Sequence, residues 1–184
     1  MPFFKSHPAD AGPANVFSAH PEIYAAWAKM SEALMNGPSP LSQAERELLL
    51  AYAAGVAGCR FVFVAHSEVA YVRGIKRGLI ERLIEDPETH AEPRLKPLLA
   101  FVAKLVLTPG EMTQADADAV FAAGWSEEAL HHAIAITARA AFMQRLVEGH
   151  GFVPMSPEAA GERARRRLED GYVNLYPAFR TRKD

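Results

Sequence analysis

Three side chains able to move protons or act as a nucleophile lie in the first half of the chain: Glu47, Cys59 and His66. Cys59 is the only cysteine, and it opens the apolar run of "AAGVAGCRFVFVAHSEVA" (53–70) that leads to His66. Near a helix N-terminus, unpaired backbone N–H groups lower the pKa of a thiol. Helical spacing puts residues 59, 62 and 66 on one face, and Glu47 faces them if two helices form a hairpin. The spacing thus predicts a proton relay in which the carboxylate orients the imidazole and the imidazole manages the thiol's proton.

The same residues also have a purely structural interpretation. A free cysteine is among the most buried residue types, and a single one in an alanine-rich helix is typical of core packing. Glu47 lies in "QAERELLL" (43–50), where acidic residues near a helix start favour the helix dipole. Spacing alone leaves both interpretations open.

Periodicity and capping signals predict helices throughout the chain. Ser42 and Glu45 form a capping box, and Asn36-Gly37 is a helix stop. Residues 59–76 contain aromatic and β-branched residues that suit a strand, but no turn signal interrupts them, and they favour a helix. The expected helices are 21–36, 42–57, 59–76, 77–86, 94–108, 113–124, 126–149 and 156–171. The fold class predicted is all-α, one compact bundle over residues 21–171.

The two ends differ from this domain. Residues 1–20 contain Pro2, Pro8 and Pro13 and are predicted to be an extended N-terminal arm. The C-terminal tail, 172–184, contains Tyr172, Leu175, Tyr176 and Phe179 in "YVNLYPAFRTRKD". Because so much apolar surface is unfavourable on a free terminus, we expect the tail to pack either on its own domain or across a neighbouring subunit.

Composition excludes several classes of function. The 184 residues are 49% hydrophobic and 23% charged, and the net charge is −2. The chain therefore has no overall positive charge that would attract nucleic acid or an anionic membrane surface. The absence of a signal peptide and the single cysteine fit a reducing cytoplasm. His131 and His132 are adjacent on a helix and point about 100° apart, so at most one can face a metal. We predict neither a metal site nor a cofactor.

The segment "SPLSQAERELLLAYAAGVAGCRFVFVAHSEVAYVRGI" resembles the core of the alkylhydroperoxidase D (AhpD) / carboxymuconolactone decarboxylase family. The family pattern is a Glu, a Cys-x-x-Cys twelve residues on, and a His four residues after the second Cys. Glu47, Cys59 and His66 match this pattern. "HPEIYAAWAKMSEAL" upstream and "MTQADADAVFAAGWSEEALHHAIAITARAAFMQRLVEGHG" downstream resemble the peroxidase-related branch. The resemblance covers roughly residues 20–155 and implies an AhpD-like helical bundle assembled as a homo-oligomer. Because the family members are oligomers of packed helical subunits, the resemblance favours the neighbouring subunit as the place where the C-terminal tail packs.

Val62 stands where the family has its second cysteine. In peroxidatic relatives one thiol attacks the hydroperoxide and becomes a sulfenic acid. The second thiol then reacts with the sulfenic acid to form a disulfide, which a dithiol reductant reduces. Since Cys59 corresponds to the supporting thiol and has no partner, the resemblance implies an AhpD-like, peroxidase-related antioxidant protein with a one-cysteine site. Its pocket is predicted to be bounded by Glu47, Cys59, Val62 and His66, with Phe63 beside them. Its substrate would be a hydroperoxide, and an external thiol would be its reductant.

Two alternatives stay open beside this one. In the first, the pocket has lost thiol chemistry, and Glu47 and His66 perform acid–base catalysis on a small molecule, as in the decarboxylase branch. In the second, the protein is a ligand-binding oligomer without catalytic activity.

Overall fold

Helices form the whole of the regular structure in the computed structural model, which describes residues 1–179. No strand occurs in this part of the chain, which confirms the predicted all-α class. The elements in order are α1 (Pro13–Ala19), α2 (Pro21–Asn36), α3 (Gln43–Val56), α4 (Arg60–Val72), α5 (Leu79–Glu85), α6 (Pro87–His90), α7 (Lys96–Leu107), the 3-10 helix η1 (Pro109–Glu111), α8 (Gln114–Ala122), α9 (Glu127–His150), α10 (Pro157–Asn174) and the 3-10 helix η2 (Pro177–Phe179).

Side-chain caps fix where several helices begin. The Ser42 hydroxyl accepts from the backbone N–H of Glu45, whose carboxylate accepts from the N–H of Ser42, so the predicted capping box is present at α3. At α9 and α10 the hydroxyls of Ser126 and Ser156 accept from the backbone N–H groups of Ala129 and Ala159, without the reciprocal bond of a capping box. Cys59 is the N-cap residue of α4, immediately before the helix and not within its first turn.

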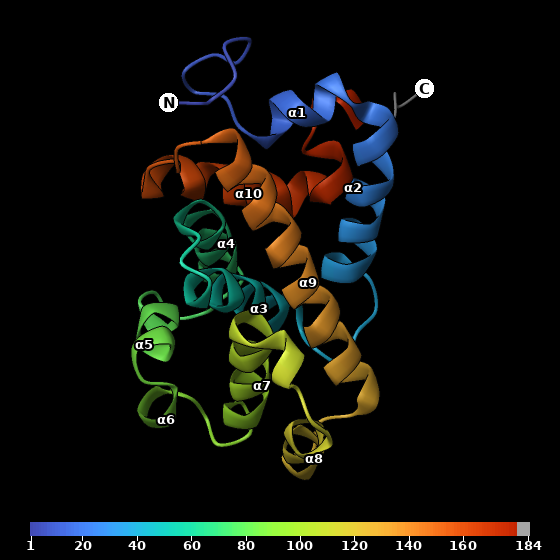
Figure 1. The fold of residues 1–184 in the computed structure, drawn as a ribbon, viewed down its shortest axis with the longest axis vertical. Helices are drawn as coiled ribbons and strands as arrows, with labels where there is room; N and C mark the ends of the chain where they lie inside the picture. Colours follow the sequence, from blue (N-terminus) through green and yellow to red (C-terminus); the bar gives the residue numbers. More distant parts are fainter. Residues whose placement is uncertain (180–184) are drawn as a thin grey trace.

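A helical hairpin of α3 and α4 occupies the centre of the molecule (Figure 1). The long α9 crosses α3, and α10 packs over α4 and α2. Helices α5, α7 and α8 lie toward the end opposite α1 and α10 (Figure 1). The apolar run of α4 is helical despite its strand-like composition because α3 covers one side and α10 another, so burial outweighs local propensity. This arrangement brings residues from the beginning, middle and end of the chain to one end of the bundle.

The N-terminal residues do not form an extended arm. Residues Pro13–Ala19 are helical, and Val16 and Phe17 are buried. The Phe17 ring stacks on Tyr24 with centroids 4.5 Å apart, which gives this segment an apolar reason to pack. The amide of Phe3 donates to the carbonyl of His150, so the first residues also lie against the domain.

The apolar side chains after residue 171 are covered by the same chain. Tyr172, Leu175 and Tyr176 are buried, and Phe179 packs on the core. The expectation that these aromatic residues lie across a neighbouring subunit is therefore wrong for the described part of the tail; residues 180–184 lie outside the described residues. Among those described, no helix is both long and apolar enough to cross a bilayer.

Candidate active site

Glu47 and His66 form a buried pair between α3 and α4. Oε2 of Glu47 lies 2.7 Å from Nδ1 of His66, and the two residues are 0% and 4% exposed. The hairpin that the sequence predicts is what brings them together, because Glu47 is in the second turn of α3 and His66 is in the middle of α4.

Tyr172 is a third member of this group, although its place near the C-terminus predicts a position in the tail, outside the site. Its hydroxyl donates to Oε1 of Glu47 at 2.5 Å, so both carboxylate oxygens are occupied. The chain turns at Gly171, whose φ of 68° and ψ of −164° are backbone angles that essentially only glycine adopts. The backbone N–H of Tyr172 then donates to Glu32 of α2. The glycine inside an otherwise helical pattern, followed by a tyrosine, is the signal that could have marked this bend.

Two buried arginines complete the cluster. Arg139 of α9 is 3% exposed, and Arg167 of α10 is 5% exposed. Their guanidinium carbons lie 4.8 Å and 4.9 Å from the centroid of the Tyr172 ring. Nη1 of Arg167 is 3.4 Å from Nδ1 and 3.5 Å from Nε2 of His66, and these near-equal distances place it over the face of the imidazole. Both arginines were missed from the sequence, although Arg139 interrupts the small apolar run "AIAITARAAF".

The pKa values of the pair follow from burial and these charges. Burial by itself would raise the pKa of Glu47, but His66, Arg167 and the Tyr172 hydroxyl together lower it to about 2. Burial lowers the pKa of His66 to about 4; the Glu47 carboxylate opposes this shift, and Arg167 and Arg139 add to it. At neutral pH the carboxylate is therefore ionised and the imidazole is neutral. Because the ionised carboxylate can only accept, Nδ1 of His66 carries the proton and Nε2 is the basic nitrogen.

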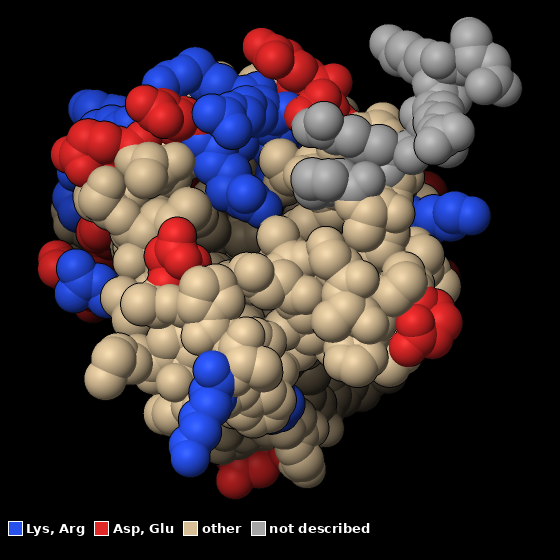
Figure 2. All heavy atoms as spheres, turned by 90° about the horizontal axis from the view of Figure 1, so that it is seen from above, with Lys and Arg blue, Asp and Glu red and all other residues tan. Residues whose placement is uncertain are grey.

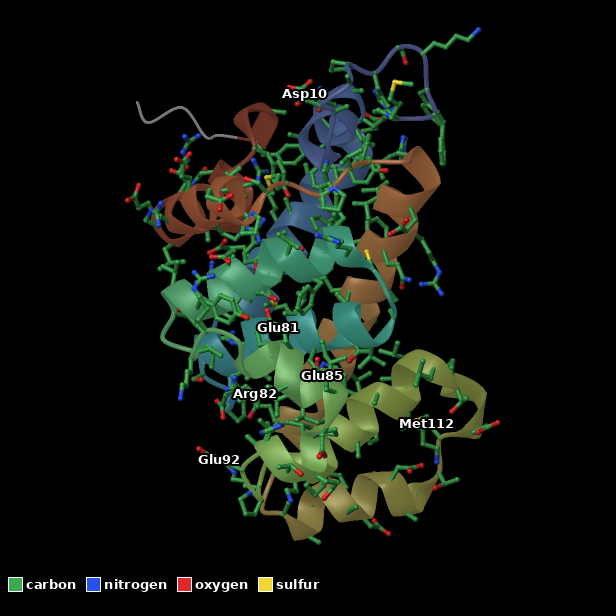
Figure 3. The ribbon with its side chains drawn as sticks, turned by 90° about the vertical axis from the view of Figure 1, so that its left-hand side faces the viewer. Asp10, Glu81, Arg82, Glu85, Glu92 and Met112 are labelled. Atoms are coloured by element: carbon green, nitrogen blue, oxygen red, sulfur yellow. The ribbon has the colours of Figure 1, made fainter. Side chains whose placement is uncertain are left out.

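A cavity of about 200 Å³ opens beside His66. Three basic side chains line it, Arg139, Arg163 and Arg167. The rest of its wall is mainly apolar and includes Phe61, Val62, Ala65, Met143, Val153 and Met155, while residues 10–15 of the N-terminal segment close one side. Figure 2 looks onto this end of the molecule and shows basic side chains gathered on one side of the face, beside a hollow in the surface. Asp10, labelled in Figure 3, lies where the N-terminal segment approaches α10.

Cys59 does not share this cavity. It is 1% exposed and lies beside a shallow depression whose lining includes Phe63 and Ile84. Burial raises the pKa of its thiol to about 11, and the nearby Glu148 carboxylate adds to this shift. The direction is opposite to the lowered thiol pKa that the sequence predicts for a cysteine at a helix N-terminus. Of the predicted pocket residues, the structure brings Glu47, His66 and Val62 together and places Cys59 and Phe63 elsewhere.

No metal centre is evident in the described part of the chain. Residues 1–179 contain no group of three or more His, Cys, Asp or Glu side chains placed to hold a metal ion. The rings of His131 and His132 are 6.0 Å apart and tilted by 65°, as expected for neighbours on a helix.

Comparisons with known proteins agree with the fold. The sequence model of the carboxymuconolactone decarboxylase family matches residues 21–104. An uncharacterized peroxidase-related protein from Silicibacter sp. TM1040 is 22% identical, with a TM-score of 0.71, over 78% of this chain and 75% of that one. A second uncharacterized peroxidase-related protein, from Ralstonia eutropha JMP134 and described as an alkylhydroperoxidase AhpD core, is also 22% identical, with a TM-score of 0.70, over 77% of this chain and 75% of that one. No curated protein sequence gives a significant match. The described residues thus have the AhpD-like fold.

Proposed function

Because the chain belongs, through residues 21–104, to the carboxymuconolactone decarboxylase family, we propose that it is an enzyme that moves protons on a small organic molecule, with the Glu47–His66 pair as its acid–base group. The observation that carries this proposal is the 2.7 Å contact between a buried carboxylate and a buried imidazole that lines a cavity. Glu47 orients the ring and stabilises the imidazolium that forms when Nε2 accepts a proton. Tyr172 holds the second carboxylate oxygen, which keeps Glu47 from rotating.

A one-thiol peroxidase, which the sequence resemblance favoured, receives less support from the geometry. With a pKa of about 11, only about one Cys59 thiol in ten thousand is ionised at pH 7, and the thiolate is the form that attacks a hydroperoxide. The thiol is 1% exposed, and it is absent from the cavity that His66 lines. The two similar structures are those of peroxidase-related proteins, but at 22% identity the similarity to them extends to the fold alone. The homo-oligomeric state and the cytoplasmic location stay predictions.

Deuterium exchange tests the proposed activity without a known product. The protein is incubated in D₂O with a panel of lactones and small organic acids that carry an acidic C–H, and loss of the C–H signal is followed by proton NMR. We expect exchange in at least one compound, abolished in His66→Ala and Glu47→Gln and retained in Cys59→Ser. A parallel assay follows consumption of tert-butyl hydroperoxide with an external thiol. Consumption that depends on Cys59, together with no exchange in any compound, would replace this proposal with the peroxidase.

A further inference from the structure

Positive charge exceeds negative charge around the cavity. Among residues 1–179, Glu47 is the one buried carboxylate in contact with this cluster, and its two oxygens already bind His66 and Tyr172. Arg139 and Arg167 are buried with it, and the half-buried Arg163 lines the same cavity. None of the three arginines forms an ion pair with a carboxylate of residues 1–179. Of the described residues that line the cavity, the exposed Asp10 is the only acidic one.

Donor atoms of both buried arginines lack partners. Nε of Arg139 donates to the Ser31 hydroxyl at 3.1 Å, but its Nη1 is buried and has no hydrogen-bond partner among the described residues. Nε of Arg167 is likewise buried without a partner in that part of the chain. Arg167 is already attracted by Glu47, and both guanidinium groups face the Tyr172 ring, but one buried carboxylate does not balance the three arginines of the cavity. The cluster therefore lacks hydrogen-bond acceptors for these buried N–H groups and a further negative charge. An anion placed between the arginines would supply both.

The cavity walls restrict what kind of anion fits. Phe61, Val62 and Met143 add apolar surface to the same cavity lining as the three arginines. A dry cavity of about 150 Å³ holds benzene, so the ~200 Å³ here suits a six-membered ring with one small polar group. Pockets of this kind take an apolar body from their walls and orient it with a few polar contacts. A planar carboxylate matches the forked donors of arginine.

We propose that the cavity binds a compact organic monocarboxylate of about the size of benzoate, with its carboxylate held by Arg139, Arg163 and Arg167 and its ring against Val62 and Phe61. This inference rests on the proposed function, because it names the substrate class of the same site. The ring then lies beside His66, whose Nε2 is the basic nitrogen. A neutral molecule of the same shape leaves the arginine donors unpaired and binds more weakly.

Calorimetric titration of the full chain with sodium benzoate tests the proposal, with benzamide as the neutral isostere and inorganic phosphate as the anion without an apolar body. We expect benzoate to bind at least about tenfold more tightly than either. Arg163→Gln is the main variant because the side chain of Arg163 is less buried than those of Arg139 and Arg167, so its substitution should disturb the fold least. It should weaken benzoate binding about tenfold, whereas the exposed Arg165→Gln on the same helix should change it less than about twofold.

Three results would overturn the proposal: no benzoate binding at millimolar concentration, equal affinity for benzoate and benzamide, or phosphate binding as tight as benzoate. An equal effect of Arg163→Gln and Arg165→Gln would also exclude the assigned arginine. Glu47→Gln separates this inference from the proposed function. Benzoate binding that persists in Glu47→Gln supports the anion site whatever the exchange assay shows, and exchange without carboxylate selectivity supports the acid–base pair alone.

Discussion

Replacing Tyr172 with phenylalanine isolates one hydrogen bond in the site. The substitution removes the hydroxyl that donates to Oε1 of Glu47 at 2.5 Å and keeps the ring that contacts Arg139 and Arg167. A hydrogen bond to a buried charge contributes about 1.5–3 kcal/mol, and the carboxylate keeps only its contact with His66. We therefore expect Tyr172→Phe to lower the free energy of unfolding by about 2 kcal/mol, or Tm by roughly 4–8 °C for a chain of this size.

Equilibrium unfolding in urea at pH 7 measures this change, with Tyr52→Phe as the matched control. Tyr52 is 3% exposed in the same core, and its hydroxyl makes no hydrogen bond within residues 1–179. Its substitution should cost less than about 0.5 kcal/mol. Tyr172→Phe should also raise the pKa of Glu47, because the hydroxyl helps to lower it. The reasoning fails if the two variants are equally stable, since the carboxylate would then have no need of the tyrosine.

The remaining predictions concern pH, the backbone and the thiol. The pKa values of His66 and Glu47 in the folded protein, about 4 and about 2, lie below their ordinary values of 6.5 and 4.5, so both groups stabilise the fold above those ordinary values. As pH falls from 6.5 to 4, protonation of His66 should remove about 3 kcal/mol from the free energy of unfolding. Protonation of Glu47 should continue this loss toward pH 2. Urea unfolding midpoints that stay constant from pH 7 to pH 4 would contradict the prediction. Gly171→Ala should cost about 1–3 kcal/mol by thermal unfolding, because a Cβ there meets Oε2 of Glu32 at 2.6 Å and the backbone angles disfavour any side chain. Cys59 should react with a thiol reagent such as DTNB in the native protein at a small fraction of its rate in 6 M guanidinium; equal rates would mean that the thiol is accessible.

Local signals in the sequence were sufficient for the longer helices from α2 onward and for one contact of the site, whereas α1 and the short α6 were not predicted. Caps such as Ser42 act within one turn, so they can be identified without knowing the fold. The Glu47–His66 contact spans 19 residues within one hairpin, which makes it a nearly local consequence of two helices joined by a short turn. Neither required knowledge of how distant helices pack.

The rest of the site depends on contacts between distant segments. Tyr172 meets Glu47 across 125 residues, and Arg167 meets His66 across 101. Periodicity tells which side of a helix is buried but not which helix covers it, so an arginine in α10 reads as a solvated charge until α10 is placed over α4. Cys59 was misplaced for a smaller reason. As the N-cap of α4 it lies outside the helical face that carries Val62 and His66.

The positions of the arginines connect substrate binding with the strength of the base. Burial lowers the pKa of His66, and Arg167 and Arg139 lower it further, so the imidazole is a weak, neutral base. A carboxylate bound between these guanidinium groups would offset their charge and raise the pKa of His66 toward neutrality. A base with a pKa near the ambient pH is the more effective one in general acid–base catalysis. Under the proposals made above, a carboxylate would therefore activate the imidazole that acts on it, and a neutral ligand of the same shape would not. A histidine pKa that rises when benzoate is added but not when benzamide is added, followed by NMR of the His66 ring, would be the signature of this coupling; an equal pKa with both ligands would show that the arginines bind without tuning the base.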